Sequence, residues 1–414
     1  MRTNIKWLLW GIASLLYAYQ YILRVMPNIM IGDIMNQFHM DSLLFGQFSG
    51  IYYIGYSLAH LPIGLLFDRY GPKKILPIFM GLTLLGTLPL LITDFWIYPV
   101  VGRFFVGIGS SAAILGVFKI IRMTFPAHQF TRMLSFSVTI GLIGALYGGR
   151  PISDLKILYG FHEVTGVVLM IGLILIGVAY FLFPLHKPHS KNDTVANELR
   201  TVISAKKSLL ICVLAGLMVG PLEGFADVWG AQFLKKVYGF DDKIAASLPS
   251  LIFVGMCFGG PALSFIAEKT NNYGVIILSA VSMAVSFILL LSGLMTQTIL
   301  SILFICVGVF CAYQIIAIYK AASYVSEKNV GLMTAVANMV IMIFGYAFHG
   351  LIGYIINYVD GARSEISHYS ASSFQWGVSI IPAALMFSAL GFMILLIREK
   401  QDEIFGVTKK ARMQ

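Results

Sequence analysis

The feature that most constrains this chain is its long runs of uncharged apolar residues. Residues 275–319 contain no Asp, Glu, Lys or Arg, and neither do residues 75–93, 164–185 and 244–267. A helix needs about 20 apolar residues to cross the hydrocarbon core of a bilayer. In that core only helices and closed barrels satisfy every backbone polar group. Only 12% of the residues are charged, about half the share in a soluble domain. We therefore predict an all-α membrane protein.

Polar residues, Gly and Pro divide these runs into separate helices. We predict twelve transmembrane helices, near residues 7–30, 43–67, 75–93, 97–123, 131–153, 163–184, 208–235, 246–267, 274–294, 298–325, 330–358 and 376–397. Twelve crossings place both termini on the same side of the membrane. Most of the 29 Lys and Arg residues lie near helix ends on that side, which marks it as cytoplasmic.

The net charge of +10 is therefore an orientation signal, and we expect no nucleic acid as a partner. The sequence has no phosphate loop, no His cluster at metal-ligand spacing and no nucleophile elbow. We accordingly expect no enzymatic activity, no cofactor and no metal. We expect a monomer that spans the lipid bilayer of a bacterial inner membrane, with both termini in the cytoplasm.

The chain divides into two halves that resemble each other. Residues 186–207 form a polar, basic stretch, which we interpret as a cytoplasmic linker between bundles at 1–185 and 208–398, followed by a tail at 399–414. Features of the first half recur in the second at a nearly constant offset: Gly55 matches Gly255, and Gly107 matches Gly308. Such recurrence indicates an internal duplication. We predict two pseudo-symmetric six-helix bundles.

The stretch GLLFDRYGPKK, residues 64–74, joins the second and third predicted helices. It resembles a signature of the major facilitator superfamily, and GRFFVGIG at residues 102–109 resembles a second one. The resemblance implies the major facilitator fold and a gating role for Asp68, which in the family helps to hold the halves together on the cytoplasmic side. Further gating candidates are Arg69 and Lys73. In the second half they are Glu268 and Lys269, which correspond to Asp68 and Arg69 in the repeat. Alternatively, these charges only set topology.

Helix 1 carries an arginine inside the membrane. Tyr17, Gln20, Tyr21 and Arg24 lie at three- and four-residue spacings, which gives one polar face. A guanidinium can bind a carboxylate or phosphate with two hydrogen bonds. The segment looks like helix 1 of the organophosphate:phosphate antiporters, where a similarly placed arginine binds the anion. Alternatively, Arg24 extends to the outer headgroups.

Helix 7 departs from those antiporters, because it carries Glu223 and Asp227 one turn apart. Two carboxylates facing Arg24 would repel a phosphate dianion but would suit a zwitterion. The patterns of helices 1, 4 and 5 are similar to bacterial intraphagosomal amino-acid transporters, and the helix 4 run GRFFVGIG is also similar, more weakly, to the lysosomal dipeptide transporter family. We expect Glu223, then Asp227, to carry the coupled proton. Alternatively, either one pairs with Arg24 and never meets the solute.

Further candidates lie on helices that line the cavity in the family. They are Gln20, Tyr21, Tyr53, Tyr56, Tyr313, Gln314, Asn338 and Tyr346 for the solute, and Arg103 for proton coupling, which the resemblance implies. Alternatively, the aromatic residues only pack, and Arg103 contacts headgroups. Lys119 and Lys320, related by the repeat, would bind an anionic group or line the cytoplasmic mouth.

We therefore expect a secondary transporter, proton-coupled, that moves an amino acid or short peptide by alternating access. Its partners would be the small-molecule solute, protons and lipid. Two alternatives stay open. One is a transporter of an organic anion or siderophore that uses Arg24 with Lys119 and Lys320. The other is a sensor that binds solute without moving it.

Overall fold

The computed structural model describes residues 3–126, 129–183, 195–326, 329–363 and 365–411, and these residues form helices and short connections without a strand. The first half comprises α1 (Thr3–Ile29), α2 (Ile31–Phe38), α3 (Ser42–Tyr70), α4 (Pro72–Thr87), α5 (Pro89–Ile92), α6 (Ile97–Thr124), α7 (Phe130–Gly148), α8 (Arg150–Tyr159) and α9 (Phe161–Leu182). α10 (Val195–Ile203) lies in the predicted linker.

The second half begins with α11 (Lys206–Gly216), the π-helix η2 (Gly220–Trp229), α12 (Gly230–Tyr238), α13 (Asp242–Ser247) and α14 (Leu251–Lys269). It continues with α15 (Asn272–Leu291), α16 (Gln297–Cys311), α17 (Tyr313–Ala322), α18 (Val330–Asp360), the short 3₁₀-helix η4 (Ile366–His368) and α19 (Ala371–Ala411).

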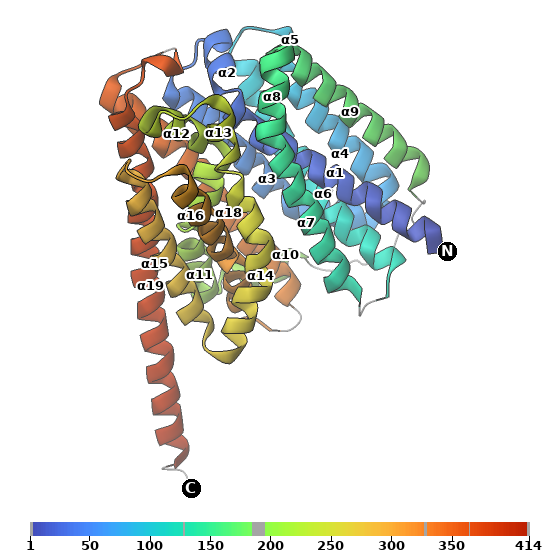
Figure 1. Cartoon of the computed structure of the whole chain (residues 1–414). Coiled ribbons are helices and arrows are strands. Elements are labelled where there is room, and N and C mark those ends of the chain that lie inside the picture. The colour runs from blue at the N-terminus through green and yellow to red at the C-terminus, as the bar shows by residue number, and fades with distance from the viewer. Residues whose placement is uncertain (1–2, 127–128, 184–194, 327–328, 364, 412–414) are drawn as a thin grey trace.

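The structure confirms the predicted fold class. Among the described residues, 11 helical stretches are long and apolar enough to cross a membrane. The remaining predicted helix, at 131–153, is divided into α7 and α8 at Gly149. The last helix is longer than predicted, because α19 begins at Ala371 and continues to Ala411. In Figure 1 it extends well beyond the rest of its half.

The helices of each half pack together (Figure 1), blue to green on one side and yellow to red on the other. The start of α1, α10 and the end of α19 point toward one end of the molecule, which we call the linker end. α2, α5, α12 and α13 lie at the opposite end, the far end. Both described ends of the chain therefore lie toward the same end of the molecule.

The turn in GLLFDRYGPKK forms as the sequence predicts. α3 ends at Tyr70 and α4 begins at Pro72, with Gly71 between them at φ 76°. Glycine adopts a positive φ without steric penalty, and proline at the first position of a helix has no N–H that needs a partner. These two residues therefore reverse the chain within a single connecting residue.

The repeated glycines allow the same close packing in both halves. A Cβ on Gly55 or Gly107 would collide with a backbone carbonyl across the contact between α3 and α6. The same holds for Gly255 and Gly308 across the contact between α14 and α16. The predicted repeat thus corresponds to a matching helix pair in each half.

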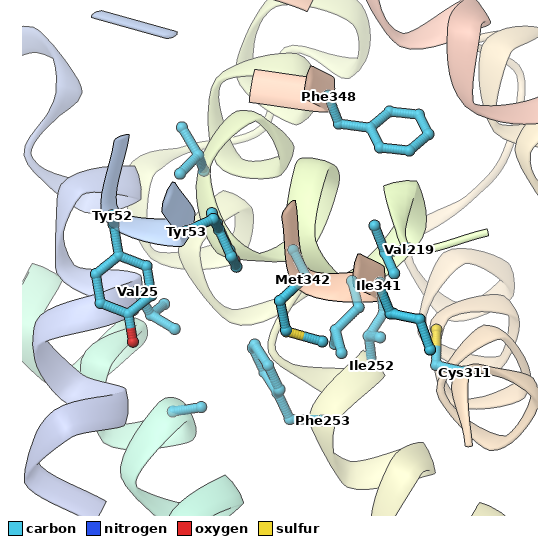
Figure 2. Packing of buried hydrophobic residues seen from close by; sticks show 14 of the residues in the cluster. Val25, Tyr52, Tyr53, Val219, Ile252, Phe253, Cys311, Ile341, Met342 and Phe348 are labelled. Carbon is cyan, nitrogen blue, oxygen red and sulfur yellow. The ribbon is translucent and has the colours of Figure 1, made fainter. Parts of the chain in front are cut away.

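The two halves are joined toward the far end. The Ser42 hydroxyl donates to the Gly353 carbonyl at 2.9 Å, and the Ser42 backbone N–H donates to the Tyr369 hydroxyl at 3.1 Å. Nearer the middle, α3 and α18 pack through apolar and aromatic side chains. Figure 2 shows part of this core, including Tyr53 from α3 and Met342 from α18.

Candidate functional site

The site lies beside Pro27, where α1 lacks one backbone hydrogen bond. Pro27 lies inside this helix, and because proline has no N–H, the carbonyl four residues earlier loses its helical hydrogen bond. That carbonyl belongs to Leu23. Arg103 of α6 donates to it at 2.7 Å and to the carbonyl of Arg24 at 2.8 Å. Arg103 therefore holds the backbone of α1 in place at Arg24, the arginine that the sequence analysis assigned to the site.

Arg24 is buried in the middle of the molecule and contacts the second half. Its side chain forms ion pairs with Glu223 and with Asp227, the latter at 2.5 Å between Nε and Oδ2. Arg24 is 7% exposed, and each carboxylate is 1% exposed. The structure thus brings together the three charged residues that the sequence singled out in helices 1 and 7.

Both carboxylates are carried by η2, a stretch that the sequence analysis treated as ordinary helix. Pro221 follows Gly220 at its start, and all its residues are buried. π-helical turns are rare and are frequent at functional sites. The carbonyl of Ala226 in η2 accepts a hydrogen bond from the Asn28 amide of α1 at 3.1 Å. Asn28 is four residues beyond Arg24, so extending the polar face of helix 1 by one turn would have identified it.

Tyr53 of α3 connects the two carboxylates. Its hydroxyl lies 2.6 Å from Glu223 Oε2 and also contacts Asp227. The Arg24 guanidinium lies 5.3 Å from the ring centroids of both Tyr21 and Tyr53, a distance at which a cation interacts favourably with an aromatic face. The site therefore joins α1 and α3 of the first half to η2 of the second.

Other predicted residues lie close to this cluster. Gln20 hydrogen-bonds to the Tyr52 hydroxyl. Tyr56 is half-buried one turn from Tyr53, and Asn338 of α18 lies within hydrogen-bonding reach of it. Tyr346 is also half-buried on α18 and packs near Gly50 of α3. These side chains line the boundary between the halves.

Two of the three candidates from predicted helix 10 are engaged within the second half. Tyr313 is buried and donates to the Ala215 carbonyl at 2.7 Å, so its hydroxyl ties α17 to α11 within the second half. Gln314 is also buried, and its Nε2 has no hydrogen-bond partner among the described residues. Lys320 pairs with Glu399 of α19 at 2.7 Å, which ties two helices of the second half together.

The predicted gating residues lie at the linker end. The side chain of Asp68 is outside the described part of the structure. Arg69, Lys73 and Lys269 each lie over an aromatic ring of their own half, and Glu268 is exposed. In the ranges that the structure describes, no ion pair joins these residues to the opposite half. Their gating role stays a prediction.

Comparison with known proteins identifies the family. The model of the Major Facilitator Superfamily matches residues 13–348, which include Arg24 and Pro27 of α1, η2 and most of α18. The chain belongs to the Major Facilitator Superfamily. It is therefore a multi-pass membrane transporter, as the two signatures indicated.

Individual relatives are distant. The uncharacterized transporter YybO of Bacillus subtilis (strain 168) is 22% identical over 374 residues, which cover 82% of this chain and 85% of YybO. A bacterial homologue of the human lysosomal transporter Spinster, in an inward-facing and unoccupied conformation, is 16% identical with a TM-score of 0.75, covering 95% of this chain and 97% of that one. The nucleoside transporter NupG is 13% identical with a TM-score of 0.72, covering 94% and 99%. At these identities the solved structures show a shared fold.

Proposed function

We propose that this protein is a proton-coupled secondary transporter that carries a small zwitterion, an amino acid or short peptide. The observation that supports this most is the buried cluster in which Arg24 of one half meets Glu223 and Asp227 of the other. In transporters of this architecture, solute and coupling-ion sites lie near the bilayer midplane between the repeats. Ionisable residues inside a membrane are expensive and mark such pathways.

The charges of the cluster complement a zwitterion. A guanidinium presents several N–H donors in a plane that matches a carboxylate, so Arg24 would bind the carboxylate of the solute. The solute ammonium would then pair with Glu223 or Asp227. A phosphate dianion fits less well, because it would lie against both of these carboxylates, which are each 1% exposed and so poorly screened by water.

The same cluster suits the binding of one proton. With both carboxylates ionised, Glu223 and Asp227 share the single guanidinium of Arg24, because the nearby guanidinium of Arg103 donates to two backbone carbonyls of α1 instead. A buried carboxylate without a full ion-pair partner is strongly unfavourable. Tyr53 contacts both carboxylates but has a single hydroxyl hydrogen. It can hydrogen-bond to both at once if one carboxyl is protonated and donates to it. One bound proton would therefore remove the surplus negative charge and let Tyr53 hydrogen-bond to both carboxyl groups.

Coupling follows from competition for Arg24. The solute carboxylate would take the place of one protein carboxylate on the guanidinium, and that displaced group would carry the proton. After the solute has left, the group would return to Arg24 and release its proton, so each cycle would move one proton with one solute. The loaded site would be neutral, with the solute ammonium on the remaining carboxylate. Since the displaced ion pair joined the two halves, its loss would free the bundles at 1–185 and 208–398 to rock about the site.

The other predicted residues belong to the same proposal. Asp68, Arg69, Lys73, Glu268 and Lys269 would gate the linker end, which would face the cytoplasm from an inner membrane. Arg103 would support proton coupling by fixing the backbone of α1 beside the cluster. A transporter of organic anions is less well supported, because Lys320 is engaged with Glu399.

The proposal is tested by uptake into proteoliposomes. The purified protein is reconstituted and offered labelled amino acids and dipeptides in pools, with and without an inward proton gradient. We expect gradient-dependent uptake that disappears in Arg24→Ala and is retained in Asp33→Asn, because Asp33 pairs with Lys156 away from the cluster. Absence of uptake from every pool by folded protein would contradict the proposal. Binding without uptake would instead favour the sensor.

A further inference from the structure

His349 is a buried polar residue at the contact between the two halves. It lies on α18 with 1% of its surface exposed, and neither ring nitrogen has a hydrogen-bond partner among the described residues. An imidazole in its neutral form carries one donor and one acceptor. Leaving such groups buried and unpaired is unfavourable, so an imidazole with both nitrogens unpaired calls for a ligand.

The ring of His349 adjoins the charged cluster. Its centroid lies 5.4 Å from that of Tyr53, with 36° between the two planes, and the Tyr53 hydroxyl contacts Glu223 and Asp227. The backbone of α3 passes close by, because a Cβ on Gly50 would lie 3.1 Å from the Cβ of His349. His349 is thus one side chain away from the carboxylates, at the boundary between the halves.

Two more polar atoms without partners occur on η2, which packs against α18. Asp227 Oδ1 and Trp229 Nε1 are buried and have no hydrogen-bond partner among the described residues. The contact between the two helices includes Gly224 and Phe348, since a Cβ on Gly224 would lie 3.1 Å from the Cβ of Phe348. Unpaired donors and acceptors therefore occur on both helices that meet beside the ion pairs.

We propose that His349 is a solute-binding residue, which hydrogen-bonds to an uncharged polar group located between the two charged ends of the solute. This inference rests on the proposed function, in which Arg24 and the carboxylates bind those ends. An amide, with one N–H and one carbonyl, or a hydroxyl would satisfy both ring nitrogens. A solute with only an apolar spacer would leave them unpaired and would bind more weakly.

The test uses His349→Leu, which removes both polar atoms, and His349→Gln, which keeps a donor and an acceptor. The chain offers a matched control in His60, which is 7% exposed and lies 5.4 Å from the ring of Tyr56 at 38°. Uptake from the dipeptide pool is measured in proteoliposomes with the proton gradient fixed, and the unfolding temperature is measured without solute.

We expect His349→Leu to raise KM about tenfold or more, because up to two hydrogen bonds to the solute are lost, with Vmax retained. Its unfolding temperature should equal or exceed that of the native protein, because two unpaired polar atoms are gone. His349→Gln and His60→Leu should stay close to native KM. Native KM in His349→Leu, or a lower unfolding temperature with reduced Vmax, would overturn the assignment and leave the transport function intact. If native protein takes up no solute from the pools, the proposed function itself fails.

Discussion

Replacing Asp227 by Asn should separate solute movement from the proton gradient. The substitution preserves the size of the side chain and its ability to accept hydrogen bonds, but it removes one negative charge. Arg24 and Glu223 would then balance each other, so the cluster would be neutral without a bound proton. The protein would then carry no proton with the solute, and the proton gradient would no longer drive uptake.

The magnitude follows from that count. One pH unit corresponds to about 1.4 kcal/mol per proton, so a transporter that carries one proton per zwitterion can accumulate it about tenfold per unit. At two units the native protein should approach about 100-fold, with the membrane potential held at zero by valinomycin and equal potassium. Asp227→Asn should reach a ratio of about one under the same conditions, since no proton drives the solute.

The assay compares accumulation with exchange. Proteoliposomes are loaded with unlabelled solute, and entry of labelled solute is measured without a gradient; Asp227→Asn should still exchange. Asp33→Asn is the control, because Asp33 pairs with Lys156 within the first half at 2.8 Å, away from the cluster. It should accumulate solute as the native protein does. Equal accumulation by Asp227→Asn and native protein would refute the assignment of the proton to this cluster.

Three further substitutions follow from the structure. Arg103→Ala should lower the unfolding temperature, because two backbone carbonyls lose their donors at about 1–3 kcal/mol each; adding Pro27→Ala restores one donor and should recover part of the loss in the same thermal assay. Gly353→Ala should weaken contact between the halves at the far end, since its Cβ would collide with a carbonyl of α3, and should increase labelling of a cysteine introduced there. Gly350→Ala, which meets open space, should leave labelling unchanged. Tyr53→Phe should reduce uptake about tenfold or more, the effect of one lost hydrogen bond to a charged group.

The charged part of the site could be predicted because charges are rare in this chain. Arg24, Glu223 and Asp227 are intramembrane ionisable residues, and counting helical rise from the basic residues at the helix starts places them at similar depths. The uncharged apolar runs, and the polar, Gly and Pro residues that divide them, were enough to predict the helices. The fold and the charged residues of the site could therefore be predicted from local features of single helices.

The supporting contacts were not predictable in the same way. The π-helical geometry of η2 depends on packing around Gly220 and Pro221, and many helices accommodate such a pair without it. The two hydrogen bonds from Arg103 to backbone carbonyls require α6 to lie beside α1 near Pro27, which is a tertiary relation. Tyr313 was predicted near the solute from its helix alone, but its hydroxyl is taken by a carbonyl of its own half. The sequence does not show which side chain on one helix bonds to which group on a neighbouring helix.

The most direct test of the account is whether solute brings protons with it through the Arg24 cluster. Proteoliposomes with a trapped pH-sensitive dye and no imposed gradient are given the zwitterion pool, with the membrane potential clamped. The account predicts internal acidification with the native protein and none with Arg24→Ala or Asp227→Asn. Uptake without acidification by the native protein, or acidification that persists in Asp227→Asn, would contradict it.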